Sequence, residues 1–319
     1  MSIPQIEDRH LAKFRDPDLT VEGEPRAFVP LQRLETLWFN TGTLCNLECA
    51  HCYIESSPRN DRLVYLTPDD LKVYLDEIER GGWQTREIGF TGGEPFMNPH
   101  LIDMLEECLH RGFEVLVLTN GMRPMMKQAA SLISLRYRYG KQLTFRVSLD
   151  HYQSEVHERE RGVRSWEPTV AGLRWLAANG FPFAVAGRRL TGETEEELRT
   201  GYGRLFAELG LALDAADPGH LVIFPEMDLT IEVPEITTHC WNILEISPVN
   251  MMCASSRMVV KRRGADRPVV LSCTLLPYDE GFEMGSTLAE AAGNVKLNHP
   301  HCAMFCVLGG GSCSSREGR

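Results

Sequence analysis

The chain has 319 residues, of which 43% are hydrophobic, and it carries a formal net charge of −11 at pH 7. This length suits one large α/β domain, or one domain with a small appendage. The longest basic run is residues 261–263. The acidic balance therefore argues against nucleic acid as a partner and, more mildly, against an anionic membrane surface.

The N-terminal stretch contains no apolar segment of the kind that a signal peptide needs. No apolar run approaches the ~20 residues of a membrane-spanning helix. We therefore expect a cytoplasmic protein. Because that compartment disfavours disulfides, the ten cysteines are interpreted as metal ligands or buried thiols.

Residues 1–34 are polar and contain several prolines, which predicts an extended lead-in. After them, short apolar strands alternate with helices as far as about Met227. The alternation predicts a parallel sheet with right-handed crossovers, either closed or half-closed as a barrel or left open. In either form, functional loops should follow the C-terminal ends of the strands. The cysteine-rich remainder is expected to form a separate small unit.

The expected elements follow one another in chain order. Strands are predicted within 35–40, 87–95, 114–121, 143–150, 183–190 and 220–227. Helices are predicted within 67–82, 98–113, 124–135, 167–180 and 195–209. For the first helix, Thr67 is the expected N-cap, Pro68 the first residue and Gly81 the stop signal.

Residues 41–53, TGTLCNLECAHCY, place Cys45, Cys49 and Cys52 directly after the first strand. A structural zinc site normally has four protein ligands, and His51 could supply the fourth. A set of buried thiols fits poorly, because the loop carries polar residues and is not an apolar helix face. An iron–sulfur cluster is the third alternative. Three thiolates on a four-iron cluster would leave one iron open to a substrate or cofactor.

The stretch CNLECAHCY resembles the signature loop of the radical S-adenosylmethionine (SAM) enzymes. The resemblance implies a 4Fe–4S cluster on Cys45, Cys49 and Cys52, whose open iron chelates the amino and carboxylate groups of SAM. The family usually has an aromatic residue before the third cysteine. Here that position is His51, which we expect beside the cofactor. The resemblance also implies a partial (β/α) barrel over residues 35–235.

The stretch TGGEP, at the end of the second strand, resembles the GGE motif of the same family. The resemblance implies that Gly92, Gly93 and Glu94 bind the methionyl amino group of SAM. Glycines permit positive φ and close backbone approach, and a glutamate can accept from an ammonium group. Taken alone, the stretch could equally be an ordinary tight turn with a solvated glutamate.

The stretches VLTNG and VSLD end the next two strands. The resemblance implies that Asn120, Ser148 and Asp150 contact the ribose and carboxylate of SAM. Ordinary turn chemistry and helix capping are the alternatives. The segment that follows, which includes Arg161, resembles the same region of peptide- and small-molecule-modifying members. Arg188 or Arg189 could reach the SAM carboxylate, although pairs of arginines are common on protein surfaces.

Six cysteines lie in the last third of the chain: Cys240, Cys253, Cys273, Cys302, Cys306 and Cys313. A predicted strand–turn–strand hairpin brings Cys253 and Cys273 to the same end. Cys302 and Cys306 then form a C-x-x-x-C pair.

Residues 236–319 resemble the SPASM and twitch accessory segments of the radical SAM family, which implies one auxiliary iron–sulfur cluster. The favoured ligands are the hairpin pair and the C-x-x-x-C pair, with Cys313 as an alternative fourth ligand. A zinc site stays open, because tetrahedral thiolate sites suit both metals. His239, His299 and His301 are possible ligands but are more often loop residues. Cys108, on an amphipathic helix, is expected to be a core thiol.

The resemblance implies reductive cleavage of SAM to methionine and a 5′-deoxyadenosyl radical, which abstracts hydrogen from the substrate. The lead-in is shorter than the ~40 residues below which small domains need added support, too short for a leader-binding domain. We therefore expect a small-molecule substrate that is oxidised, epimerised or rearranged, with a peptide as the alternative. The expected electron donor is a flavodoxin or ferredoxin. A non-catalytic iron–sulfur or zinc sensor is the alternative of another class, and it would not need Glu94 and its glycine turn.

Overall fold

The structure, a computed structural model, describes residues 13–311 of the chain. Within these residues an eight-stranded sheet has the strand order β7-β6-β5-β4-β3-β2-β8-β9, and β1 pairs separately with β10. The strands are β1 Phe28–Val29, β2 Thr36–Asn40, β3 Glu87–Thr91, β4 Glu114–Thr119, β5 Leu143–Ser148, β6 Phe183–Arg188, β7 Leu221–Phe224, β8 Ser256–Val260, β9 Val269–Leu271 and β10 Val295–Lys296.

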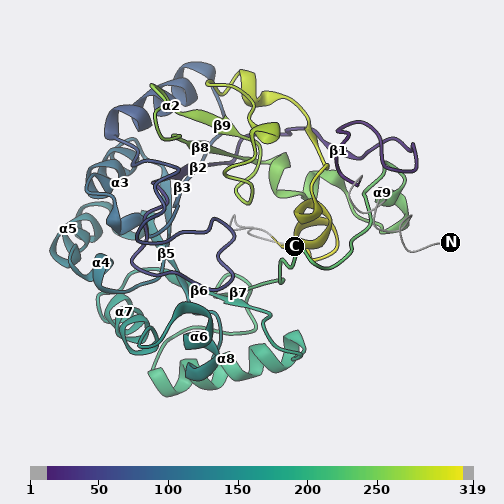
Figure 1. Ribbon diagram of the computed structural model, residues 1–319. Helices are drawn as coiled ribbons and strands as arrows, with labels where there is room; N and C mark the ends of the chain where they lie inside the picture. The colour runs from purple at the N-terminus through teal and green to yellow at the C-terminus, as the bar shows by residue number, and fades with distance from the viewer. Residues whose placement is uncertain (1–12, 312–319) are drawn as a thin grey trace.

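Helices cover the outer side of this curved sheet, as Figure 1 shows. The α-helices are α2 Pro68–Gly81, α3 Leu101–His110, α4 Arg123–Met126, α5 Ala129–Tyr139, α6 Ser154–Arg161, α7 Trp166–Ala178, α8 Glu195–Leu209 and α9 Cys240–Ile243. Short 3₁₀ turns occur at η1 Pro95–Met97, η2 Gly140–Gln142, η3 Pro248–Asn250, η4 Met252–Ala254, η5 Glu280–Phe282 and η6 Glu290–Ala292. A π-helix, η7, spans Cys302–Val307.

Strands β2 to β7 run parallel, each hydrogen-bonded to the next along the chain. Among the described residues the edge strands β7 and β9 do not pair, so the sheet stays an open partial barrel. The predicted fold class is confirmed. Because β2 to β7 run in the same direction, the loops that follow these strands lie at the same rim of the barrel.

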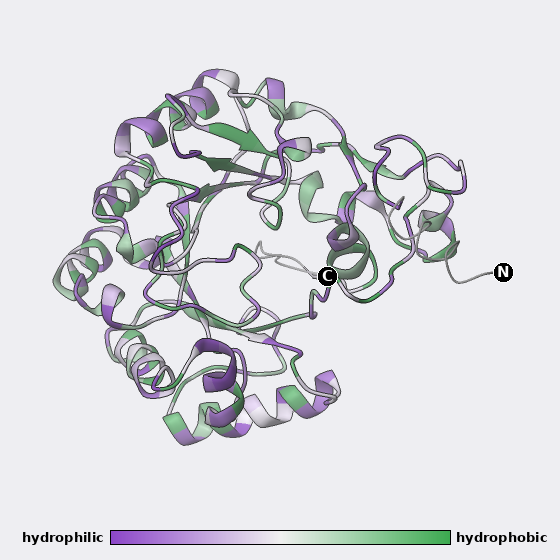
Figure 2. Ribbon diagram, viewed as in Figure 1, coloured by the Kyte–Doolittle hydropathy of each residue, from purple (hydrophilic) through white to green (hydrophobic). Residues whose placement is uncertain are grey.

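Side chains of β2 alternate between two hydrophobic clusters. Leu37 and Phe39 pack with the outer helices, whereas Trp38 packs on the opposite face with residues of the C-terminal part. This alternation is what a strand buried on both faces requires. In Figure 2 the strands β8 and β9 are strongly hydrophobic and the outer helices carry both colours, as amphipathic helices should.

The first predicted helix begins as expected. Thr67 accepts a hydrogen bond from the Asp70 backbone N–H, and Asp70 accepts in return from Thr67, which forms a capping box. Gly82, one residue beyond the predicted stop, closes the helix with φ of 62°. Cys108 is fully buried in the core, as predicted.

The sequence-based expectations differ from the structure in several places. The single helix predicted at 124–135 is divided into α4 and α5. Helix α6 was not predicted, because its sequence is highly charged and gives no sign that Val156, His157 and Glu160 are buried. The lead-in is not merely extended, since β1 pairs with β10 near the other end of the chain.

The predicted hairpin of the cysteine-rich part forms as β8 and β9, which pair antiparallel. It does not stand apart, however, because β8 pairs in parallel with β2 and so continues the barrel sheet. The expectation of a separate small unit is therefore corrected for this hairpin. The division of the chain at residues 34 and 235 stays a prediction.

Candidate functional site

One cavity of about 170 Å³ lies at the rim where the parallel strands end. Three cysteine side chains meet there: Cys45, Cys49 and Cys52. Other predicted cofactor-binding residues line the same cavity: His51, Gly92, Gly93, Asn120, Ser148, Asp150 and Arg188. The structure thus brings together residues that are up to 143 positions apart, because each one ends or follows a parallel strand.

Backbone amides point at two of the three sulfurs. The Leu47 N–H donates to Cys45 Sγ at 3.4 Å, and the Ser56 N–H donates to Cys52 Sγ at 3.4 Å. Such donors favour the thiolate form that a metal needs. Burial acts in the other direction and raises the pKa of Cys45 to about 12. The Cys45 thiol therefore becomes a ligand only when a metal displaces its proton.

The turn after β3 packs directly on the cysteine loop. A Cβ at Gly93 would lie 2.2 Å from the Leu44 carbonyl oxygen, and one at Gly92 would lie 2.5 Å from the Gly42 oxygen. The Gly93 N–H donates to that Gly42 oxygen at 2.8 Å. These glycines are therefore required for the close approach of two backbone segments, in addition to lining the cavity.

The Glu94 carboxylate turns away from the cavity toward the end of β4. It accepts from Thr119 Oγ1 at 2.8 Å, from the Asn120 N–H at 2.8 Å and from the Phe96 N–H at 3.2 Å. The residue is 2% exposed, and this burial raises the pKa of Glu94 to about 7 despite the three donors. Glu94 thus ties the β3 turn to the β4 end, and it is not among the residues that line the cavity.

Asp150 and Arg161 form a buried ion pair beside the thiols. Arg161 Nε and Nη2 donate to the two Asp150 carboxylate oxygens at 2.8 and 3.0 Å. Burial alone would raise the pKa of Asp150, but the Arg161 guanidinium outweighs it and holds the pKa below its usual value. Asp150 is therefore ionised and engaged by a partner within the chain.

Two further contacts connect the cysteine loop to α6. The side chain of His51 is 60% exposed, and its Nδ1 lies 2.7 Å from Glu160 Oε2. The Ala50 N–H donates to the Glu160 backbone oxygen at 2.8 Å. Arg188 Nη1 lies 3.6 Å from the same carboxylate, while its Nη2 donates to Glu226 at 2.8 Å. The side chains of His51 and Arg188, which were predicted to lie at the cofactor, are thus held by carboxylates of this chain.

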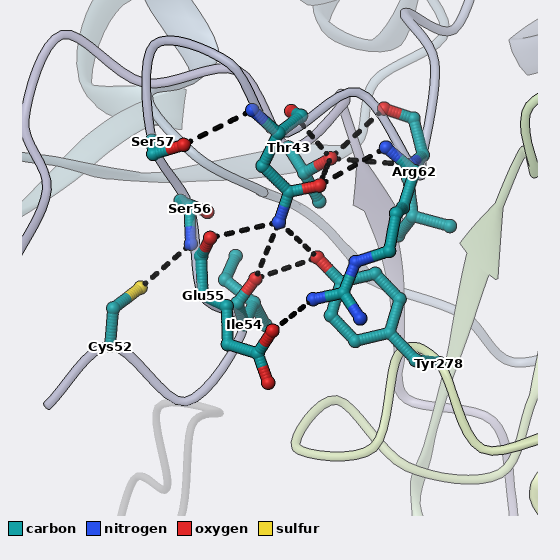
Figure 3. A network of polar contacts seen from close by, with 10 residues as sticks. Thr43, Cys52, Ile54, Glu55, Ser56, Ser57, Arg62 and Tyr278 are labelled. Atoms are coloured by element: carbon teal, nitrogen blue, oxygen red, sulfur yellow. Dashed lines mark hydrogen bonds and ion pairs between the residues drawn. The ribbon is translucent and has the colours of Figure 1, made fainter.

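The C-terminal part supports the loop that follows Cys52, as Figure 3 shows. Tyr278 Oη donates to the Ile54 carbonyl oxygen at 2.6 Å and accepts from Asn60 Nδ2 at 3.0 Å. The Arg62 guanidinium lies 3.6 Å from the centre of the Tyr278 ring and pairs with Glu55. The conformation of the barrel loop therefore depends on a residue more than 200 positions away.

A second, smaller cavity lies inside the C-terminal part. All four favoured cysteines line it: Cys253, Cys273, Cys302 and Cys306. The π-helix η7 holds Cys302 and Cys306 on one side, since residues four apart share a face of such a helix. Cys240 does not line this cavity, and Cys313 lies outside the described residues.

The other groups around this tail cavity are almost all apolar, including Leu276, Phe282 and Val295. The exception is His301, which is 7% exposed and whose Nδ1 has no hydrogen-bond partner. Burial keeps its pKa below the ordinary value, so the ring is neutral near pH 7. Four thiols and one imidazole in an apolar pocket match the donors that iron–sulfur sites use.

Within residues 13–311 no three His, Cys, Asp or Glu side chains are close enough to share a single metal ion. No helix in these residues has the length and apolar character needed to cross a bilayer.

Residues 39–200 match the sequence pattern of the Radical SAM superfamily, which is half of the chain. The chain belongs to the radical SAM superfamily. This family uses a 4Fe–4S cluster and SAM, so the predicted enzyme class and its cofactors are confirmed.

Two curated relatives of this radical SAM chain are maturation or biosynthesis proteins. The antilisterial bacteriocin subtilosin biosynthesis protein AlbA of Bacillus subtilis is 36% identical over 143 residues, which is 44% of this chain and 30% of AlbA. The mycofactocin maturase MftC of Mycobacterium tuberculosis is 31% identical over 137 residues, or 43% of this chain and 33% of MftC. The alignments thus span about a third of each relative.

Two solved structures share the fold of this radical SAM chain at low identity. SuiB of Streptococcus suis with bound SAM has a TM-score of 0.57 at 14% identity, over 88% of this chain and 67% of SuiB. Native anSMEcpe with bound SAM has a TM-score of 0.58 at 14% identity, over 85% of this chain and 82% of anSMEcpe. Both likenesses extend beyond residues 39–200 and so include the C-terminal part.

Several residues of the radical SAM site were not predicted from the sequence. Glu160 and Glu226 hold the side chains of His51 and Arg188. Arg161 was noted only as part of a stretch that resembles the family. Arg146, on β5, also lines the cavity. Nothing in the helical sequence around residue 160 separates its buried charges from solvated ones, so the fold was needed to find them.

Proposed function

We propose that this radical SAM enzyme is a maturase that modifies a peptide substrate. Sequence similarity to AlbA and MftC supports this alternative better than the small-molecule substrate expected from the sequence. The matches cover about a third of those relatives, so substrate and partners are carried over here as proposals. Modification of a small molecule stays as the second candidate.

A cavity with two chemically different walls carries the proposal. The three thiols, the β3 turn and the polar strand ends form one wall. The apolar residues that line the same cavity form the other and include Ile54, Phe224, Met227, Leu275 and Phe305. Such a wall excludes water and can hold an aliphatic or aromatic side chain of a peptide against the bound SAM.

The residues of the polar wall would hold the cofactors. When bound, the cluster on the three cysteines supplies an electron that cleaves SAM to methionine and a 5′-deoxyadenosyl radical. The Gly92–Gly93 backbone would face the methionyl group, with Glu94 fixing that turn from behind. Asn120 and Ser148, at neighbouring strand ends, would contact the rest of SAM.

The charged residues of the polar wall have a positioning role in this proposal. Asp150 is held ionised by Arg161, and Arg188 is held between Glu160 and Glu226. His51 is oriented by Glu160 next to the third cysteine. These pairs would fix the side chains before SAM binds, so that little reorganisation is needed during the reaction.

The tail cavity would hold an auxiliary iron–sulfur cluster on Cys253, Cys273, Cys302 and Cys306, as in SPASM and twitch segments. The convergence of four thiols in one apolar pocket supports this assignment. A flavodoxin or ferredoxin would supply electrons, and a cytoplasmic location would suit such a partner. Replacing both Cys302 and Cys306 by Ala should lower the iron and sulfide content while leaving the barrel cluster in place.

The enzymatic proposal is tested by SAM cleavage. Anaerobically reconstituted protein should form 5′-deoxyadenosine with dithionite and SAM, and Cys49→Ala should abolish it. The matched control is Cys108→Ala, because Cys108 is a core thiol far from the cavity. Continued cleavage by the Cys49 variant would refute the assignment of the cluster to this cysteine, and no cleavage by the wild type would favour the non-catalytic sensor.

Peptide and small-molecule substrates can be separated with the same assay. Short peptides that contain aliphatic or aromatic residues should raise 5′-deoxyadenosine formation above the uncoupled rate and should change in mass. The free amino acids of the same composition should not. Stimulation by small molecules alone would reverse the choice of substrate.

A further inference from the structure

Arg257 is buried beside the tail cavity without any carboxylate partner. It is 1% exposed, although arginine is almost never fully buried unless it is paired. Among residues 13–311 no acidic side chain forms an ion pair with it. Its side chain projects from β8, the strand that begins three residues after Cys253.

Backbone carbonyl groups accept all of the Arg257 hydrogen bonds. Nη1 donates to Cys253 O at 2.6 Å and to Ser256 O at 2.8 Å, Nε donates to Ala291 O at 2.8 Å, and Nη2 donates to Gly293 O at 3.1 Å. These contacts engage four of the five N–H donors but leave the positive charge uncompensated. Burying such a charge costs free energy that a nearby anion would offset.

The contact with Cys253 ties the guanidinium to the tail cavity. The carbonyl that accepts from Nη1 belongs to Cys253, whose side chain lines that cavity. The guanidinium also interacts electrostatically with Cys253 and Cys273. Because a guanidinium is always protonated in proteins, a fixed positive charge lies beside the residues that would hold the cluster.

We propose that Arg257 is the counter-charge of the tail iron–sulfur cluster and raises its reduction potential. Reduction by one electron adds a negative charge to a cluster that its thiolates already make anionic. A fixed cation in an apolar surrounding stabilises the reduced form more than the oxidised form. This inference rests on the proposed tail cluster. Arg257 is a positioning residue, because it places a positive charge beside the cluster and contacts no substrate.

A second buried arginine provides the matched control. Arg26 also interacts electrostatically with Cys302, but it forms an ion pair with Glu235 at 2.5 Å. The pair is neutral as a whole. Replacing both partners by glutamine should therefore leave the potential of the tail cluster nearly unchanged.

The experiment measures the midpoint potential of the tail cluster alone. A background with Cys45, Cys49 and Cys52 replaced by Ala removes the barrel cluster, and the tail cluster is titrated with dithionite and followed by electron paramagnetic resonance. Arg257→Gln should make reduction about tenfold less favourable at a fixed potential, a downward shift of about 59 mV for a one-electron couple. Arg257→Lys, which keeps the charge, should stay close to the background value.

Each outcome decides the proposal. A wild-type potential in Arg257→Gln with full iron content would overturn it, as would a Lys variant shifted as far as the Gln variant. If Arg257→Gln loses its tail iron, retention of iron by Arg257→Lys supports the counter-charge, and loss in both variants refutes it. Absence of tail iron in the Arg257-intact background would instead refute the proposed tail cluster itself.

Discussion

The two cysteine sites of this radical SAM enzyme differ in how their charges are balanced. At the barrel site the cations Arg161 and Arg188 are paired with carboxylates. At the tail site Arg257 is paired only with carbonyl oxygens. In the first arrangement each of these two cations has a carboxylate partner within the chain, beside a pocket that must admit a charged cofactor. The second leaves a positive charge whose balance depends on the cluster.

The comparison predicts its largest effect at the junction between the β3 turn and the cysteine loop. Gly93→Ala would place a Cβ 2.2 Å from the Leu44 oxygen and force the two segments apart. We expect iron binding at the barrel site and formation of 5′-deoxyadenosine to be nearly abolished, while the tail iron is retained. Gly192→Ala is the control, because no atom lies within 4 Å of a Cβ built there. Equal activity of the two variants would contradict the packing role of Gly93.

The next largest effect concerns Arg161, the arginine that is paired with Asp150. Arg161→Gln would leave the Asp150 carboxylate buried without its partner, which should cost about 3–5 kcal/mol of unfolding free energy. Adding Asp150→Asn should recover part of this loss. Urea denaturation of the cluster-free proteins would measure both values. A single variant as stable as the wild type would show that the pair contributes no stability.

A smaller effect concerns His157, on α6 beneath the same ion pair. This side chain is fully buried against Trp166, and burial lowers its pKa to about 4. A histidine whose folded pKa lies below its unfolded value stabilises the fold above pH 6.5 and loses this contribution as the pH falls. The linkage predicts a loss of about 2 kcal/mol between pH 7 and pH 5.

The measurement compares urea denaturation of the wild type and His157→Phe at the two pH values. The phenylalanine keeps the aromatic contact with Trp166 and cannot be protonated. The pH dependence should therefore be shallower in the variant by the stated amount. Parallel pH profiles would show that another group is responsible.

The smallest effect concerns the contact between the two parts of the chain. Tyr278→Phe removes a donor to the Ile54 oxygen and an acceptor for Asn60, which should cost about 1 kcal/mol. We expect faster loss of barrel iron to a chelator, by a few fold, with SAM cleavage otherwise intact. Tyr137→Phe is the control, because Tyr137 is 90% exposed. Identical rates of iron loss would show that the barrel loop does not depend on this hydroxyl.

Much of the barrel site could be predicted because its signals are local. The three cysteines, the glycine turn and the polar strand ends are each short motifs, and parallel topology brings them to one rim. The role of Glu94 was harder to predict. A carboxylate next to two glycines could face a ligand or the protein, and only the positions of Thr119 and Asn120 decide between them.

Charge pairing at long range could not be predicted. Arg257 lies in an apolar strand, where sequence alone cannot say whether a single arginine faces solvent or the interior. Its four acceptors come from segments up to 36 residues away. The pairing of β8 with β2, more than 200 residues apart, also left no local signal.

The position of β8 has a consequence for any attempt to isolate the catalytic half. Strand β2 leads into the cysteine loop, and it shares backbone hydrogen bonds with β3 on one side and β8 on the other. A chain cut after residue 235 would leave one edge of β2 without a hydrogen-bonded partner. Trp38 would also lose the C-terminal side chains that pack against it. Such an edge invites aggregation. The cysteine-rich segment therefore acts as a structural wall of the barrel as well as a site of its own, and shortened versions should accumulate as insoluble protein.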